Sequence, residues 1–298
     1  MKYSIQKQHY LKINEVEISQ NQFEELKQAR SILLLAQTIE EIYEIVISNY
    51  VELEKDLLSK SIEFIVRQHF MYSDSFEDRA LVNRRLINIL TSTKLYTDHI
   101  SKREFNSFNP EKITIKEILS KEYDDNKYYR FMEIIRNHVQ HEGLAVHLTQ
   151  YNSKRIGEVG SSQLQYTFDF SSKRSRLIEN KRLKRRVLDE FEEEIDLKFA
   201  LRKYIEGISR IHMAIREIIS DSVGQSRSII ENAQHLYKQH YSDFTEYIHA
   251  CITNTENGQI IESIPLLLNW DDVRLKLLER NKILSNLSRM YASGAVNS

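Results

Sequence analysis

The stretch FMEIIRNHVQHEG, residues 131–143, marks the place where a helical pattern ends and a strand pattern begins. Gly143 stands where a left-handed residue commonly ends a helix, so we expect a left-handed C-terminal cap there. The next segments, LAVHLTQYNS and SSQLQYTFDFSS, alternate apolar and polar residues and are rich in Val, Thr, Tyr and Phe. This alternation predicts a β-hairpin over residues 144–171.

Outside the hairpin, the sequence favours long helices. Seven Gly and two Pro are few for 298 residues, and both residues punctuate tight turns, so their scarcity favours helices with few tight loops. Apolar residues spaced three and four apart predict the helical ranges: two or more helices in 21–65, then 75–101, 127–141, 189–220, 226–251 and 270–291, with a loop at 254–258. Residues 3–18 alternate in part, which suits a short strand or an irregular arm.

Polar residues mark the expected helix starts. Ser75 can accept a hydrogen bond from the free amides of a first turn. Thr114 and Glu117 form a capping-box pattern. Asn126 ends a polar run that can cap the helix starting near Lys127.

The predicted fold is mainly α: a helical bundle with an inserted β-hairpin and extra C-terminal helices. Along the chain we divide it into a helical region in 1–145, the hairpin insertion in 146–172 and a C-terminal helical region in 173–298. We expect the two helical regions to pack as one compact unit. An isolated hairpin is marginally stable, so it should pack on the helices or on a partner.

Bulk charge and cysteine content narrow the class of protein. The net charge is −1, so any binding of a polyanion has to come from a local patch. The single cysteine, Cys251, excludes an intramolecular disulfide and a cysteine-rich metal cluster, and it suits a reducing compartment. The longest apolar run, Ile32 to Ala36, is far shorter than the roughly 20 residues that span a bilayer. We expect a cytoplasmic protein with no membrane partner.

The polar residues of the opening stretch are not spread evenly around its helix. On a wheel of about 100° per residue, Arg136, Asn137 and His141 share one polar side, while His138 lies on the opposite border. The buried stripe consists of Phe131, Met132, Ile135 and Val139. The plain interpretation is a solvated face near a helix C-terminus, where positive charge complements the helix dipole.

A second interpretation comes from a family. The string from Arg136 to His141, RNHVQH, resembles the R-x4-6-H motif of HEPN domains, with Asn137 as the polar residue that follows the Arg. The resemblance covers residues 20–145 and implies a HEPN-like helical bundle. It also implies a metal-independent ribonuclease that works as a homodimer, with the motifs of two protomers meeting in one cleft. HEPN domains are shorter than this chain, so the hairpin and the C-terminal helices would be additions.

The resemblance assigns roles that suit the residue types. His141 would be the general acid and base, Arg136 would stabilise the phosphate, and Asn137 would orient the phosphate or the His. RNA carries its own nucleophile, the 2′-OH, so attack on the phosphodiester mainly needs a proton acceptor and a cation. Arg offers a planar, always-charged fork to phosphate oxygens. We therefore expect no cofactor and no metal site.

The resemblance also suggests partners. RNA would be the substrate, and an inhibitory protein partner would restrain a toxin or antiviral-defence effector. The alternative, from a different class, is a catalytically silent HEPN-like scaffold that binds a protein partner through its hairpin or its C-terminal helices. Intact Arg136 and His141 make the activity chemically feasible.

Residues 173–186, KRSRLIENKRLKRR, form a basic segment with eight Lys or Arg in fourteen positions. Such a cluster can follow an RNA backbone. The candidate RNA-binding residues are Lys181, Arg182, Lys184, Arg185 and Arg186. The alternative is a solvated helix paired with the acidic run at 189–196. No aromatic residue interrupts the basic segment, so base stacking is not indicated.

Overall fold

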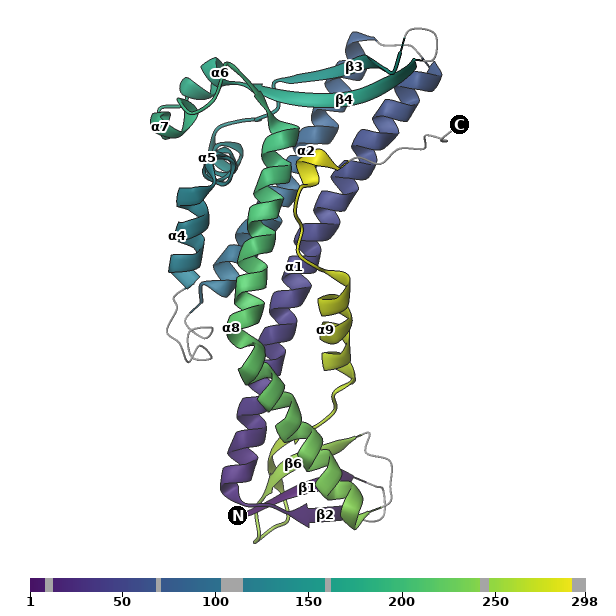
Figure 1. Cartoon of the computed structure of the whole chain (residues 1–298). Helices are drawn as coiled ribbons and strands as arrows, with labels where there is room; N and C mark the ends of the chain where they lie inside the picture. Colours follow the sequence, from purple (N-terminus) through teal and green to yellow (C-terminus); the bar gives the residue numbers. More distant parts are fainter. Residues whose placement is uncertain (9–12, 68–70, 103–114, 159–161, 242–246, 291–298) are drawn as a thin grey trace. The chain divides into compact units, whose positions relative to one another are not determined.

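The computed structural model describes residues 1–8, 13–67, 71–102, 115–158, 162–241 and 247–290 (Figure 1). Internal contacts divide the chain into two compact units. Unit 1 comprises Met1–Glu41, Lys102–Lys112 and Ile215–Lys282, and unit 2 comprises Ile42–Ser101, Ile113–Ala214 and Ile283–Ser298. The described residues are mainly helical, as predicted. The grouping by contacts differs from the division into 1–145, 146–172 and 173–298, which stays a prediction.

Two long helices replace the shorter ones expected from the sequence. Helix α1 runs without a break from Gln20 to Arg67, and α8 from Leu197 to His240. The prediction of two or more helices in 21–65, and of a break between 220 and 226, was therefore wrong. Neither helix contains a Pro, the residue that most strongly interrupts a helix. Each helix contributes residues to both units.

Unit 1 is built on a four-stranded antiparallel sheet with the order β2-β1-β6-β7. Its strands are β1 (Lys2–Gln8), β2 (Ile13–Glu17), β6 (Ile248–Thr253) and β7 (Ile260–Pro265). Of the two alternatives for residues 3–18, a short strand and an irregular arm, the strand is the one observed, as β1 and β2. The helix expected over 226–251 was wrong at its end, because β6 occupies Ile248–Thr253. Cys251 is buried in β6, opposite Ser4 of β1. The short apolar run at 248–252 suits either a buried strand or a helix, and periodicity alone does not separate them.

The remaining predictions for unit 1 concern its last loop and helix. The loop at 254–258 is confirmed as the turn between β6 and β7, and Gly258 has a φ of +69° there. Helix α9 spans Asn269–Arg280, so it ends well before the predicted residue 291. The 3-10 helix η1 follows at Leu287–Arg289.

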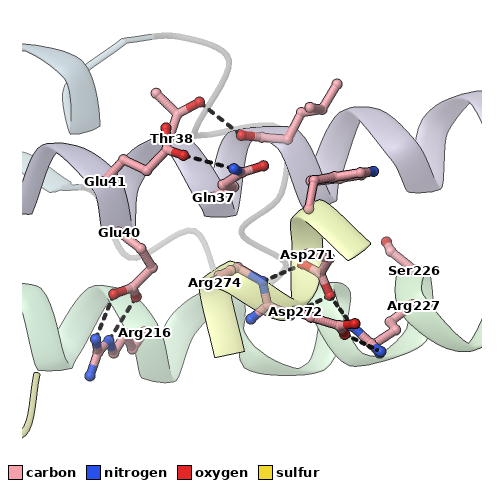
Figure 2. A network of polar contacts seen from close by, with 12 residues as sticks. Gln37, Thr38, Glu40, Glu41, Arg216, Ser226, Arg227, Asp271, Asp272 and Arg274 are labelled. Atoms are coloured by element: carbon pink, nitrogen blue, oxygen red, sulfur yellow. Dashed lines mark hydrogen bonds and ion pairs between the residues drawn. The ribbon is translucent and has the colours of Figure 1, made fainter. Parts of the chain in front are cut away.

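Buried ion pairs join α8 to α9 and α1 within unit 1 (Figure 2). Asp271 is fully buried and accepts hydrogen bonds from Arg227 at 2.6 Å and from Arg274 at 2.6 and 3.0 Å. Arg216 of α8 forms a bidentate pair with Glu40 of α1, at 2.7 and 2.5 Å. Each buried carboxylate thus faces at least one guanidinium, which offsets the cost of removing the charges from water.

Unit 2 holds the predicted hairpin. Strands β3 (Leu148–Ile156) and β4 (Gln163–Lys173) pair antiparallel, with Leu148 opposite Ser171, and the short strand β5 (Glu194–Asp196) extends this sheet. The hairpin at 144–171 is confirmed for the described residues. The helix predicted from residue 189 was wrong over its first part, because α8 begins only at Leu197 and β5 lies directly before it. Three residues carry too little periodicity to indicate a strand.

The other helices of unit 2 are α2 (Tyr72–Ile100), α4 (Ile115–Asp125), α5 (Lys127–His141), α6 (Arg174–Ile178) and α7 (Arg185–Leu188). Helix α2 begins before Ser75, so the predicted cap was wrong. Instead, the Asp74 carboxylate accepts from the Met71 N–H at 2.7 Å. The capping box predicted at Thr114 lies outside the described residues.

The core of unit 2 contains aromatic rings in contact with a buried histidine. The His212 ring stacks on Tyr43 with a centroid distance of 3.7 Å, and its Nδ1 lies 2.9 Å from the Tyr96 hydroxyl. Tyr204 of α8 packs against Tyr129 of α5. Helix α5 also contacts α2, α4 and α7. These contacts fix the position of α5, the helix that carries the RNHVQH motif.

Candidate functional site

The start of α5 is set by Asn126, as predicted. Its side-chain oxygen accepts from the N–H groups of Tyr128 and Tyr129, at 3.1 and 3.2 Å. These bonds satisfy two of the amides that a first turn leaves free. Three residues of the predicted apolar stripe, Phe131, Met132 and Ile135, are fully buried. This cap and this stripe set the register of the polar motif residues.

The end of α5 differs from the prediction at Gly143. The cap residue is Glu142, with φ −128°, and Gly143 does not have a positive φ. The N–H groups of Glu142 and Gly143 both donate to the His138 carbonyl, at 2.8 and 3.2 Å. The last turn is therefore closed by backbone bonds to one carbonyl, and the predicted left-handed cap was wrong.

Arg136 lies in a polar network rather than in open solvent. Its Nη1 is 2.7 Å from a Glu133 carboxylate oxygen, and its side chain is only 12% exposed. The other oxygen of Glu133 accepts from the Tyr204 hydroxyl at 2.7 Å. The Arg136 Nη2 donates to Asn137 Oδ1 at 3.3 Å, while its Nε is buried without a hydrogen-bond partner among the described residues. Glu133 therefore neutralises the positive charge of Arg136, the residue that the resemblance expects to stabilise the phosphate.

The other two motif residues are exposed. Asn137 and His141 both lie at the surface of α5. Across the described residues, no hydrogen bond or ion pair engages the His141 side chain. An accessible imidazole can accept a proton from a substrate or donate one to it.

His138 connects α5 to the basic segment, a role that the sequence did not indicate. It is buried, and its Nδ1 lies 3.1 Å from the Asn180 amide nitrogen. Next to it, Arg182 Nη1 lies 2.7 Å from the Glu142 carboxylate. Two contacts therefore hold residues 180–182 against the last turn of α5, and Figure 1 shows α6 and α7 near α5.

The basic segment is not one helix, so that alternative was wrong. It folds as α6 and the start of α7 with turns between them. Its side chains Leu177 and Leu183 are buried, as are Val187 and Leu188 directly after it. The five candidate RNA-binding residues, Lys181, Arg182, Lys184, Arg185 and Arg186, are all exposed. Pairing with the acidic run is partial, as in the contact of Arg174 with Asp189 at 3.8 Å. Positive charge thus remains at the surface beside α5.

A further histidine, His147, contacts the first residue of the basic segment, Lys173. Its Nδ1 accepts from the Lys173 N–H at 2.9 Å and lies 3.1 Å from the Ser172 hydroxyl. Burial lowers the pKa of His147, and the positive charge of Arg176 lowers it further. The accepting Nδ1 places the proton of the neutral ring on Nε2. The predicted hairpin brings its two ends together, but the sequence does not fix the strand register that places His147 beside Lys173.

The described residues contain no group of three or more His, Cys, Asp or Glu side chains arranged to hold a metal ion. Within the same residues, none of the helices has both the length and the apolar character needed to cross a bilayer. A scan against protein-family models gave no match, and searches of curated proteins and of solved structures found no similar protein. The HEPN resemblance therefore rests on the motif itself.

Proposed function

We propose that the chain is a metal-independent endoribonuclease of HEPN type. One observation carries the proposal: exposed His141 ends the helix against which the basic segment lies, and Arg182 of that segment pairs with Glu142, the residue after His141. RNA cleavage needs an accessible side chain that can take and return a proton, and a local excess of positive charge. Both occur together at this end of α5.

In the proposed reaction, His141 takes the proton of a 2′-OH, and the 2′ oxygen attacks the adjacent phosphorus. The bond from phosphorus to the 5′ oxygen breaks, and that oxygen takes the proton that His141 received from the 2′-OH, so the imidazole returns to its neutral form. The products are a 2′,3′-cyclic phosphate and a 5′-OH. Arg136 and the basic segment balance the charge of the phosphate, and Asn137 orients it. The proposal requires no cofactor.

We further propose that the active species is a homodimer with two copies of the motif in one cleft. By two-fold symmetry, a second protomer would bring a second exposed His141 and a second Asn137 to the same cleft. At protein concentrations below the dimer dissociation constant, the cleavage rate should then rise with the square of the concentration. A toxin or antiviral-defence role in the cytoplasm, restrained by an inhibitory protein, would follow from such an activity.

The chemistry is tested with two RNA substrates of the same sequence, one natural and one with 2′-O-methyl groups throughout. We expect cleavage of the natural RNA with cyclic phosphate ends, and none of the methylated RNA, because it lacks the nucleophile. Cleavage of both substrates would contradict 2′-OH attack.

The scaffold alternative has its own supporting observation. The Arg136 side chain is 12% exposed and paired with Glu133, as expected for a structural arginine. Two results together would favour this alternative. The wild type would cleave no RNA at any concentration, and His141→Ala would bind a protein partner as well as the wild type does.

A further inference from the structure

Two histidines contact the basic segment at different points, and both do so through Nδ1. His147 Nδ1 accepts from the N–H of Lys173, the first residue of the segment, at 2.9 Å. His138 Nδ1 lies 3.1 Å from the side-chain nitrogen of Asn180, in the middle of the segment. We call His138 and His147 the histidine pair. All four residues belong to unit 2, so these contacts lie within one compact unit.

The neighbouring bonds fix which atom donates in the Asn180 contact. Asn180 Oδ1 accepts from the Arg182 N–H at 2.9 Å, so the nitrogen of the same amide is the atom that faces His138. An amide nitrogen only donates, so His138 Nδ1 is the acceptor. The backbone N–H of Lys173 also only donates. Each of the two contacts therefore requires an imidazole whose Nδ1 carries no proton.

Protonation of Nδ1 would place one N–H group against another. The Ser172 hydroxyl, 3.1 Å from His147 Nδ1, can turn to accept from a protonated ring. The Lys173 N–H cannot, so it would lose its acceptor. The Asn180 amide would likewise lose its acceptor on His138, unless its side chain turned and gave up the bond from Arg182. A charged ring is therefore incompatible with the observed bonds at both points.

The surroundings of His147 disfavour a charged ring. Partial burial lowers its pKa most, and positive charge on Arg176 of α6 and on His138 of α5 lowers it further. The Leu144 carbonyl and the carboxylate of Glu179 act in the opposite direction but do not outweigh these causes. Near His138, the charges of Arg182 and Glu142 compensate each other in an ion pair at 2.7 Å.

The basic segment depends on such contacts for its structure. Its helix α6 has five residues, whereas isolated helices shorter than about 12 residues are marginal in water. Apart from the histidine pair, the buried side chains Leu177 and Leu183 hold it, together with the exposed pair of Arg182 and Glu142. Loss of two hydrogen bonds is therefore a large change for a segment with few anchors.

We propose that the histidine pair is a pH-sensitive switch that holds the basic segment on α5 at neutral pH and releases it in weak acid. In the held form both rings accept through Nδ1, and in the released form both rings take up protons. The switch itself does not rest on the proposed nuclease activity, since it involves no RNA. Where that activity is present, release would move positive charge away from His141.

The direction of the pH dependence follows from His147. Its pKa is lower in the held form than the ordinary value of 6.5, so the released form binds the proton more tightly. The contact therefore contributes fully above about pH 6.5 and is lost as the pH falls below that value.

Hydrogen exchange of the full chain, followed by mass spectrometry at about pH 7.5 and about pH 5.5, tests the switch. After correction for intrinsic exchange rates, amides 174–186 of the wild type should exchange roughly tenfold faster at the lower pH, because each extra proton bound by the released form shifts the equilibrium by up to tenfold per pH unit. Amides 200–210 of α8 serve as the internal reference and should not change.

Asparagine variants assign the effect to the two rings. Asn offers a side-chain oxygen close to the position of Nδ1 and does not titrate, so His147→Asn should reduce the pH effect. The double variant His138→Asn with His147→Asn should abolish it. His235→Asn is the matched control and should behave as the wild type, because His235 is an exposed histidine of unit 1.

Three outcomes would overturn the proposal: no faster exchange of the segment in the wild type, the same acceleration in the double variant, or an equal acceleration in α8. Should the double variant fail to fold, the wild type still decides. The midpoint of the change in exchange should coincide with the titration of the His147 imidazole followed by NMR. Midpoints that differ by about one pH unit or more would reject the switch.

Discussion

Nδ1 of His138 lies 3.1 Å from the amide nitrogen of Asn180, and this contact joins the motif helix to the basic segment. The two residues are far apart in sequence, and the hairpin lies between them. The contact is largely removed from solvent, whereas the neighbouring pair of Arg182 and Glu142 is at the surface. The burial of the first contact and the exposure of the second predict different consequences for stability.

Asn180→Ala should destabilise the protein more than Arg182→Ala. The first substitution leaves a buried imidazole nitrogen without its partner, which costs about 1–2 kcal/mol of unfolding free energy. Arg182 has a side chain that is 78% exposed, and exposed ion pairs contribute about 0–1 kcal/mol. Urea unfolding of both variants checks the order. An equal loss of stability would show that the His138 contact does not anchor the segment.

Glu133→Gln should increase RNA affinity. The amide still offers an oxygen to Tyr204 but no longer neutralises Arg136, so the guanidinium becomes available to phosphate. Because a partly exposed pair is worth at most about 1 kcal/mol, the gain should be roughly twofold to fivefold. Fluorescence anisotropy with labelled RNA measures it. Glu192→Gln, an exposed substitution in the acidic run, controls for the change in net charge. Equal gains in both variants would mean that Arg136 does not bind phosphate.

Two glycines of α8 should respond to alanine in opposite directions. A Cβ on Gly207 meets Glu122 Oε1 at 2.6 Å, so Gly207→Ala should cost about 1–3 kcal/mol of unfolding free energy. Gly224 has nothing within 4 Å of its Cβ position, so Gly224→Ala should stabilise the helix by about 0.5–1 kcal/mol. Urea unfolding curves of the wild type and both variants give the two changes in unfolding free energy. Stabilisation by Gly207→Ala would contradict the close approach of α8 to Glu122.

The ion pairs of Asp271 predict a loss of stability in acid (Figure 2). Burial disfavours the charged carboxylate, but hydrogen bonds from Arg274 and Arg227 outweigh it and hold the pKa of Asp271 below its ordinary value. A carboxyl group with a lowered folded-state pKa stabilises the protein above its unfolded pKa. This contribution is lost as the pH falls through the folded pKa, so the unfolding free energy should drop below about pH 4.

Substitution at Asp271 separates this contribution from other acid effects. Asp271→Asn should cost about 3 kcal/mol at neutral pH, because buried guanidinium groups lose their carboxylate, and it should flatten the acid dependence. Asp272→Asn is the control, since that side chain is 52% exposed. Urea unfolding across the acid range measures both. An unchanged pH profile in Asp271→Asn would assign the acid loss to other groups.

Local signals predicted the parts of the fold that depend on neighbours in sequence. The hairpin and the Asn126 cap were recognised because alternation and capping act over a few residues. The pairing of β1 with β6 was missed because it joins the two ends of the chain, and no local pattern encodes it. In the site, the pairing of Arg136 with Glu133 was readable from their spacing of three. The contact of His138 with Asn180 was not, because it depends on how the segment folds after the hairpin.

The central claim is that His141 cleaves RNA without a metal ion. The most direct measurement incubates total RNA with the wild type, His141→Ala and His235→Ala in excess EDTA. His235 is an exposed histidine on α8 and serves as the matched control. We expect cleavage by the wild type and by His235→Ala, and a loss of roughly a hundredfold or more in His141→Ala, as for removal of a general acid or base. The claim would be contradicted if His141→Ala cleaved RNA at the wild-type rate. It would also be contradicted if the wild type cleaved RNA only after a metal ion was added.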